Sequence, residues 1–286
     1  MKENLLRVGE IPYTNCCNIY YYLKRKYPVH GVEYLRGTPA ELNALLRSAE
    51  IDLCLSSSIE YACLGNAEYL ILPGFCIGAR GAMPSIRLFS KSPIENLDGA
   101  GIALTDESAT TVVLLKIILA RFFGFSNEFT TSKTDLEDGL RSSDAVLLIG
   151  DRALASGAAG AQGIYSYDLS SIWQERTGTP FVFALWTLRK AVLQEKRGAL
   201  VAGFYRALEL SHRELETPDE ELIREVLAER PFMTTHQLKE YWSLISYELT
   251  GDYLKGLELF YSMALRTRQI PELPEIELYK PQSFFQ

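Results

Sequence analysis

Residues 177–186, Thr-Gly-Thr-Pro-Phe-Val-Phe-Ala-Leu-Trp, decide the fold class of this chain. The run Pro180–Leu185 predicts a β-strand, and seven further β-rich runs precede it with amphipathic segments in most of the gaps. This alternation is typical of an α/β fold with largely parallel sheets. The eight predicted strands are Leu5–Ile11, Val32–Arg36, Ile51–Ser56, Tyr69–Leu72, Ile86–Ser90, Gly101–Thr105, Ala145–Ile149 and Pro180–Leu185.

Eight strands are too many for one small sheet, which usually has about five or six. We therefore predict two lobes, with Ser85–Ser90 and Pro180–Trp186 placed where the chain crosses between them. Lobe one comprises residues 1–87 and 183–286, lobe two comprises residues 88–182, and a ligand cleft lies between the lobes. An α/β half followed by a separate all-α domain is the less economical alternative. Three segments with helical periodicity are expected to pack as helices on lobe one: Ala191–Leu215, Gln237–Leu249 and Tyr253–Arg266.

Several helix ends carry local signals. Thr38-Pro39-Ala40-Glu41 is a capping box with proline at the first helical position, which predicts a helix from there to about Ser48. Ser108 is the expected N-cap of the next apolar run, and Gly124 its left-handed C-cap. A second box is predicted at Thr217–Glu220. The small-residue stretch Ser156–Gly163 predicts a loop or hinge.

Composition excludes several classes of protein. Hydrophobic residues make up 47% of the chain and charged residues 23%, which is typical of a globular domain rather than a disordered one. The net charge of −7 disfavours nucleic acid and anionic membrane surfaces as partners. No apolar run approaches the roughly 20 residues of a bilayer span. The first residues lack the apolar core of a secretion signal, so we expect a cytoplasmic protein.

Neither a metal nor a cofactor is expected. The five cysteines form no C-x-x-C pair, and the adjacent Cys16 and Cys17 are interpreted as ordinary thiols. The three histidines, His30, His212 and His236, lie outside the strand-to-helix turns where α/β proteins bind ligands. The chain also lacks a P-loop, a G-x-S-x-G elbow and a G-x-G-x-x-G turn after a strand.

Hydroxyl and amide side chains instead gather where predicted strands end. Together with the free N–H groups of helix N-termini, such side chains suit a carboxylate or phosphate. Any one cluster alone is better explained as a plain helix cap. The four clusters together predict a pocket for a small anion. They are Tyr13-Thr14-Asn15, Ser56-Ser57-Ser58, Ser85 and Ser108-Ala109-Thr110-Thr111.

Five motifs, in order along residues 5–190, resemble the chorismate dehydratase family of the futalosine route to menaquinone. The resemblance implies the two-lobed fold of type II periplasmic binding proteins, used here as a carbon–oxygen lyase. It also implies conversion of chorismate to 3-[(1-carboxyvinyl)oxy]benzoate and water. The motifs are Ile11-Pro12-Tyr13-Thr14-Asn15, residues 50–61 (EIDLCLSSSIEY), residues 84–90 (PSIRLFS), residues 148–154 (LIGDRAL), and residues 168–186, which end in TGTPFVFALW.

The resemblance also implies site residues. The family's asparagine falls on Asn15 and its serine on Ser85, and both are implicated in holding the enolpyruvyl carboxylate of the substrate. Four further residues, Ser57, Ser58, Thr110 and Thr111, match other pocket-lining positions. The residues after Asn15 depart from the family pattern, with Cys16-Cys17-Asn18-Ile19 in place of a Thr or Ser and a nearby proline-leucine pair.

For several other residues the sequence allows either a functional or a structural role. Asp151 either acts on the substrate or serves as a helix cap or lobe contact. Tyr13 and the run Tyr20-Tyr21-Tyr22 either line a ring pocket or belong to the core. Three arginines, Arg80, Arg87 and Arg152, are candidates for binding a carboxylate, although a solvated surface position is expected for at least two of them.

A mechanism without a side-chain base follows from these residue types. Loss of water makes the ring of chorismate aromatic, so the protein needs mainly to fix geometry. We hypothesise that the enolpyruvyl carboxylate of the substrate takes the ring proton itself. The alternatives are a dihydroxynaphthoate synthase-like enzyme, whose family carries a histidine where this chain has Gly150-Asp151, and a non-catalytic binding protein for a small carboxylate.

Overall fold

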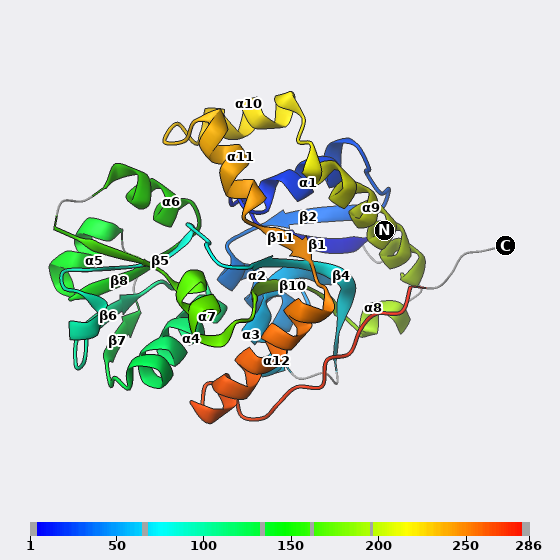
Figure 1. The fold of residues 1–286 in the computed structure, drawn as a ribbon. Coiled ribbons are helices and arrows are strands. Elements are labelled where there is room, and N and C mark those ends of the chain that lie inside the picture. Colours follow the sequence, from blue (N-terminus) through cyan, green and yellow to red (C-terminus); the bar gives the residue numbers. More distant parts are fainter. Residues whose placement is uncertain (1–4, 65–67, 132–134, 161–162, 195–196, 282–286) are drawn as a thin grey trace.

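Two mixed β-sheets form the frame of two lobes (Figure 1). The computed structural model describes residues 5–64, 68–131, 135–160, 163–194 and 197–281. The first sheet has the order β11-β4-β10-β3-β1-β2, and the second has the order β7-β6-β8-β5-β9. The strands of the first sheet are β1 (Leu6–Glu10), β2 (Val32–Arg36), β3 (Leu53–Ser57), β4 (Tyr69–Ala79), β10 (Phe181–Arg189) and β11 (Ser246–Glu248). Those of the second are β5 (Ile86–Ser90), β6 (Gly101–Leu104), β7 (Glu128–Thr131), β8 (Ala145–Ile149) and β9 (Tyr165–Asp168).

The chain passes between the sheets twice. It leaves the first sheet after β4 and enters the second with β5, which pairs antiparallel with β8 and β9. It returns with β10, which lies antiparallel between β3 and β4. The predicted two-lobed α/β fold is therefore confirmed, and the alternative of two sequential domains is wrong. The lobe boundaries at 87/88 and 182/183 stay a prediction; by strand pairing, β5 belongs to the second sheet along its whole length and β10 to the first.

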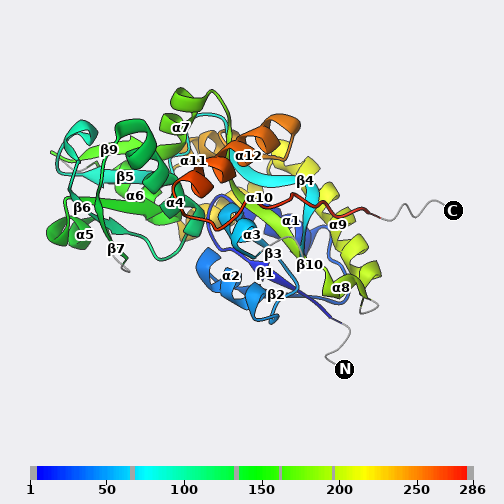
Figure 2. The same cartoon turned by 90° about the horizontal axis from the view of Figure 1, so that it is seen from below.

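Helices cover both sheets. Lobe two carries α4 (Ala109–Ile117), α5 (Leu136–Ser142), α6 (Gly150–Ala159), α7 (Leu169–Thr177), a 3₁₀ turn at Ile94–Asn96 and a π-helical turn at Ile118–Phe123. Lobe one carries α1 (Cys17–Arg25), α2 (Pro39–Arg47), α3 (Ser58–Leu64), α8 (Ala191–Gln194), α9 (Gly198–Arg213), a 3₁₀ turn at Glu214–Glu216, α10 (Glu220–Glu229), α11 (Thr235–Ser243) and α12 (Gly251–Arg266). Seen from below, α4 of lobe two lies beside α3 and α12 of lobe one (Figure 2).

An aromatic cluster sits where the chain returns to lobe one. The ring of Phe181, at the start of β10, packs against Trp173 of α7 at 5.2 Å and against Phe260 of α12 at 4.9 Å between centroids. All three side chains are buried. In α12, Gly256 passes so close to Pro180 that an added Cβ would lie 2.1 Å from the Pro180 carbonyl oxygen. The return strand is therefore packed tightly between the two lobes.

Most of the predicted helix ends are confirmed. Thr38 and Glu41 form the reciprocal capping box at the start of α2. The Ser108 hydroxyl accepts from the Thr111 N–H, and Gly124 closes the helical segment in the left-handed region with φ 76°. Three of the predicted strands, at residues 32–36, 86–90 and 145–149, have the bounds that the sequence predicts.

Other local predictions are wrong. The second capping box does not form. The N-cap of α10 is Asp219 rather than Thr217; its side chain makes no capping hydrogen bond, and its N–H donates to the Tyr22 hydroxyl. The stretch 156–159 is the end of α6 rather than a loop, and residues 161–162 of that prediction lie outside the described residues. The helix expected over Gln237–Leu249 ends at Ser243, because Ser246–Glu248 pairs with β4.

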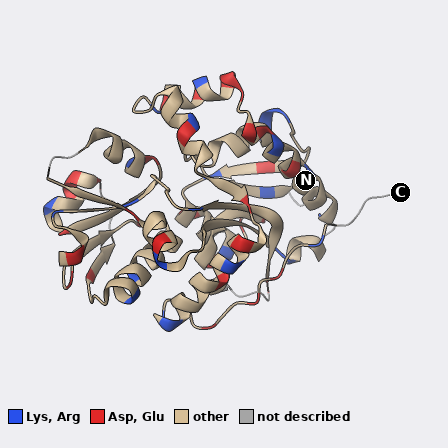
Figure 3. Cartoon of the chain, viewed as in Figure 1, with Lys and Arg blue, Asp and Glu red and all other residues tan. Residues whose placement is uncertain are grey.

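Within the residues described, the structure has no helix both long and apolar enough to span a bilayer. Lysine and arginine are interspersed with aspartate and glutamate on both lobes (Figure 3).

Candidate functional site

The turn after β1 joins lobe one to lobe two through two side chains. The Tyr13 hydroxyl donates to Glu107 Oε2 at 2.7 Å, just before α4. The backbone N–H and the hydroxyl of Thr14 both donate to Asp151 Oδ1 in the first turn of α6, at 3.0 and 2.6 Å. Burial and the Glu107 hydrogen bond raise the pKa of Tyr13 far above its usual value, so its hydroxyl stays protonated and donates. These contacts bridge the two lobes, and we call the arrangement in which they are made the closed form.

Arg230, which follows α10, ties a third element to this junction. Its Nε donates to Asp151 Oδ2 at 3.0 Å and to the Thr14 hydroxyl oxygen at 2.6 Å. Its Nη2 donates to the Pro12 carbonyl oxygen at 2.6 Å. The Arg230 side chain is only 6% exposed, so its positive charge must be balanced by nearby carboxylates. Asp151 and Glu229 supply them, and Arg230 Nη1 lies 3.0 Å from Glu229 Oε2. We call Thr14, Asp151 and Arg230 the interlobe latch.

A cavity of about 380 Å³ and one of about 350 Å³ flank this junction. The 350 Å³ cavity brings together Tyr13 and Asp151, as the sequence predicts. Of its arginines, Arg152 reaches Glu107 at 3.4 Å, whereas Arg36 forms no ion pair within the described part of the chain. The lining residues are Pro12, Tyr13, Arg36, Thr38, Glu107, Ile149, Asp151, Arg152, Glu229 and Arg230.

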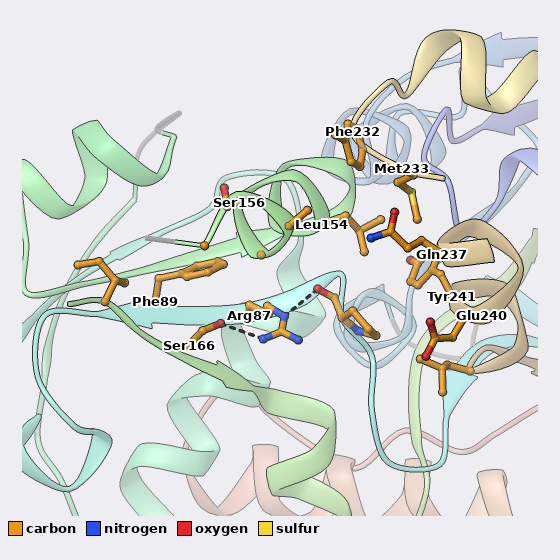
Figure 4. A pocket seen from close by; sticks show the side chains of 16 residues that line it. Arg87, Phe89, Leu154, Ser156, Ser166, Phe232, Met233, Gln237, Glu240 and Tyr241 are labelled. Atoms are coloured by element: carbon orange, nitrogen blue, oxygen red, sulfur yellow. Dashed lines mark hydrogen bonds between the residues drawn. The ribbon is translucent and has the colours of Figure 1, made fainter. Parts of the chain in front are cut away.

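The 380 Å³ cavity lies between lobe two and α11 (Figure 4). Its wall is largely apolar and includes Phe89 and Leu154. Arg87 enters it from β5 and is held by the Pro84 carbonyl oxygen at 3.1 Å and by the Ser166 hydroxyl at 2.9 Å. The third candidate carboxylate binder, Arg80, instead forms an exposed ion pair with Asp252 at 3.1 Å, as expected for a solvated arginine.

Ser85 lies at the start of β5, where lobe two meets α11. Its carbonyl oxygen accepts from the Gly150 N–H at 2.8 Å, and its hydroxyl oxygen accepts from the Tyr241 hydroxyl at 2.8 Å. Gly150 has φ +57°, and an added Cβ there would stand 3.1 Å from the Tyr13 ring. This position therefore requires glycine for its backbone conformation as well as for space. Ser85 is therefore hydrogen-bonded to the residue that directly precedes Asp151 of the interlobe latch.

Asn15 is half-buried directly after Thr14, and its Oδ1 accepts from the Cys16 thiol at 3.3 Å. Burial raises the pKa of the Cys16 thiol well above its usual value and that of Cys17 to about 12. Both are therefore protonated thiols at neutral pH. Asn15 and Ser85 are not among the residues lining either cavity, but the neighbouring Tyr13 lines the 350 Å³ cavity and Pro84 lines the 380 Å³ cavity.

The other candidate residues form a separate contact between the lobes. Ser58 and Thr110 are fully buried and lie 3.3 Å apart, oxygen to oxygen. A chain of hydrogen bonds runs from the Ile59 N–H through Thr110 and Ser58 to the Val182 carbonyl oxygen. These two hydroxyls thus connect α3, α4 and β10.

The two neighbouring candidates have local partners as well. The Ser57 N–H donates to Asn43 Oδ1 at 3.4 Å. Thr111 is bound to Ser108 at the start of α4, through its N–H at 3.3 Å and through its hydroxyl at 3.0 Å. Neither residue lines the two cavities, and their place in a substrate pocket stays a prediction.

Sequence reasoning missed Glu107, Arg230 and Tyr241. Each lies far along the chain from the turn or strand that it contacts, and no local motif marks it. The histidines are placed as expected: none lines either cavity. Of the three, His212 packs against Phe75 at 5.5 Å between ring centroids, and burial lowers its pKa. In the part of the chain described, no group of three or more His, Cys, Asp or Glu side chains is arranged to hold a metal ion.

Two lobes whose strand-end turns face each other define an α/β protein with the type II periplasmic binding protein fold. The structure is similar to the periplasmic aliphatic sulphonate binding protein SsuA of Escherichia coli, with a TM-score of 0.65 at 15% identity over 99% of this chain and 94% of that one. It is also similar to a protein of Archaeoglobus fulgidus, with a TM-score of 0.73 at 19% identity over 93% of this chain and 99% of that one. Likeness at such identities establishes the fold alone.

Sequence comparison identifies the family. A family model described as "Menaquinone biosynthesis" matches residues 6–266, and the chain belongs to this family. The chain is 36% identical over 223 residues to the chorismate dehydratase of Thermus thermophilus, and this aligned region covers 71% of this chain and 79% of that protein. It is 30% identical over 182 residues to the chorismate dehydratase of Campylobacter jejuni, covering 62% and 64% respectively. The resemblance drawn from the motifs is confirmed.

Proposed function

We propose that this chain is a chorismate dehydratase, a hydro-lyase of menaquinone biosynthesis that forms 3-[(1-carboxyvinyl)oxy]benzoate and water. The 36% identity with the Thermus thermophilus enzyme over 71% of the chain carries this proposal. In the reaction a ring C–H bond and the neighbouring C–OH bond break. The electron pair of the C–H bond becomes the third ring double bond, and the proton leaves with the hydroxyl as water.

The substrate carries two carboxylates, so the site must supply local donors although the chain as a whole is negative. We assign the enolpyruvyl carboxylate to the Asn15 amide and the Ser85 hydroxyl, which belong to the facing edges of the two lobes. Arg36 lines the 350 Å³ cavity and forms no ion pair with a described residue, and we assign it to attract the second negative charge. Because Asn15 and Ser85 line neither cavity in the closed form, chorismate enters while the interlobe latch is parted.

The proton-accepting group in this proposal is the enolpyruvyl carboxylate itself. Holding it against the ring proton makes the transfer intramolecular, and positioning of this kind is worth roughly 7 kcal/mol or more of the barrier. Closure of the lobes then excludes water from the reacting groups. Gly150 and Asp151 stand at the strand end where the sister enzyme, dihydroxynaphthoate synthase, carries a histidine, so that enzyme's base chemistry is not favoured here.

We also propose that the protein works in the cytoplasm. All five cysteines are free thiols in the structure, and four of them are buried or half-buried. Reduced thiols accord with a reducing compartment, where disulfides are rare. Fractionation of the producing cell with an antibody to the chain tests this location, and recovery in the periplasm contradicts it.

Incubation of the purified chain with chorismate tests the activity. Loss of chorismate absorbance, together with a product whose mass is one water lower and whose ring is aromatic, is expected. Tight binding of chorismate with no product identifies a binding protein instead. Absence of both binding and product overturns the proposal altogether.

A further inference from the structure

The hydroxyl group of Ser85 has one partner within the described part of the chain, and that partner is a donor. The Tyr241 hydroxyl donates to Ser85 Oγ at 2.8 Å, while Ser85 itself is only 1% exposed. No described residue accepts the Ser85 proton. A buried hydroxyl left without an acceptor is unfavourable, so this proton requires an oxygen that the closed, substrate-free chain does not supply.

Tyr241 is well suited to stay the donor of this pair. Its side chain is buried, and burial raises its pKa well above the usual value, with a further rise from the negative charge of Asp151. A phenol that keeps its proton has a single hydrogen to give, and it gives it to Ser85. The Ser85 hydroxyl is thereby prevented from pointing its own hydrogen back at Tyr241.

The helix that carries Tyr241 also contacts the turn that contains the other candidate residue, Asn15. Trp242, the next residue of α11, donates its indole N–H to the Thr14 carbonyl oxygen at 2.7 Å, directly before Asn15. Helix α11 starts at a complete capping box formed by Thr234 and Gln237, which fixes its first turn. One rigid helix therefore holds both the strand that begins after Ser85 and the turn that contains Asn15.

We propose that Tyr241 is a positioning residue for the dehydration reaction, which fixes Ser85 as a hydrogen-bond donor to the enolpyruvyl carboxylate of chorismate. This inference rests on the proposed function. Tyr241 does not touch the substrate in this account; it acts through Ser85 alone. Without the phenol hydrogen, the Ser85 hydroxyl rotates freely between its staggered positions and presents its hydrogen to the carboxylate only part of the time.

A double-mutant cycle tests the role of Tyr241. Tyr241→Phe is expected to lower kcat/KM for chorismate about tenfold, and Ser85→Ala by more. In the Ser85→Ala background, Tyr241→Phe should change kcat/KM by less than twofold, because the hydroxyl that it orients is gone. A loss that is equally large in both backgrounds overturns the proposal, since Tyr241 then acts independently of Ser85.

Tyr247→Phe is the matched control. Tyr247, in β11, is also buried, and its hydroxyl accepts from the Asn18 side-chain amide at 2.7 Å rather than contacting Ser85. The control should lower the thermal midpoint as much as Tyr241→Phe while leaving kcat/KM within twofold of the parent. If both variants lose activity alike, Tyr241 has only a structural role.

The parent protein separates this proposal from the proposed function. A parent that forms no aromatic product refutes the function, and the role of Tyr241 falls with it. An active parent with an equally active Tyr241→Phe variant refutes only the role of Tyr241. All four variants are to be compared at a temperature at which circular dichroism shows each of them folded.

Discussion

Replacing Asp151 by asparagine should shift the protein from its closed form toward an open one. The carboxylate accepts three hydrogen bonds across the lobe boundary, two from Thr14 and one from Arg230. Hydrogen bonds to a charged group are worth about 1.5–3 kcal/mol each. Asp151 is 28% exposed, and an asparagine oxygen retains some of these bonds in neutral form, so solvent screening reduces the net loss to about 2 kcal/mol. A loss of 2 kcal/mol lowers the ratio of closed to open protein roughly 30-fold.

Small-angle X-ray scattering and steady-state kinetics together measure this effect. The substrate-free variant should have a larger radius of gyration than the parent. Its kcat for chorismate should fall by up to about 30-fold, because the closed substrate complex loses the same latch contacts. Asp252→Asn is the matched control, because Asp252 pairs with Arg80 at 3.1 Å on the open surface. An exposed pair of this kind is worth about 0–1 kcal/mol, so the control should change neither quantity.

Two results would refute the role of Asp151 as part of the interlobe latch. If kcat falls while the radius of gyration stays at the parent value, the carboxylate contacts the substrate directly. If neither changes, the latch contributes nothing to closure.

Two further predictions concern packing and thiol reactivity. Gly256→Ala should lower the free energy of unfolding by about 3 kcal/mol in thermal denaturation, because the added Cβ meets the Pro180 carbonyl oxygen. The control Gly251→Ala, whose Cβ would have nothing within 4 Å, should leave the free energy of unfolding unchanged or slightly higher. Equal effects of the two substitutions would contradict the tight packing at the return strand. Ellman's reagent at pH 8 should modify one thiol in the native chain, the exposed Cys63, and all five thiols after unfolding. In the native chain, burial raises the pKa values of the other four thiols and keeps them protonated; these are Cys16, Cys17, Cys54 and Cys76. Burial also raises the pKa of Cys63, so its reaction rate should keep increasing above pH 9, and a plateau below that pH would contradict the assignment.

The buried strands of this fold are predictable from the sequence because their residues repeat a strong apolar pattern. Ile86–Ser90 and Ala145–Ile149 are examples, and the second is buried along its whole length. The strands that the sequence did not reveal, β7, β9 and β11, are short edge strands in which most side chains are exposed or half-buried. A strand of three or four such residues carries no periodicity, and its pairing partner decides its conformation.

The candidate site was predictable only where it follows strand ends. Tyr13 and Asp151 each come after a recognisable strand, and the topology of two facing sheets brings them to one cavity. Arg230 and Tyr241 come from the C-terminal helices, more than 150 residues from Thr14 and Ser85. Their contacts depend on how those helices dock against both lobes, which periodicity and capping signals do not encode.

The central claim is that the facing edges of two lobes, furnished with an amide and a hydroxyl, hold chorismate so that its own carboxylate removes the ring proton. Turnover of chorismate by Asn15→Ala and Ser85→Ala, in protein shown to be folded, tests this claim most directly. The account predicts that each substitution lowers kcat/KM by at least about 100-fold, since each removes a charge-assisted hydrogen bond and the orientation that it provides. Rates close to that of the parent in both variants would contradict it.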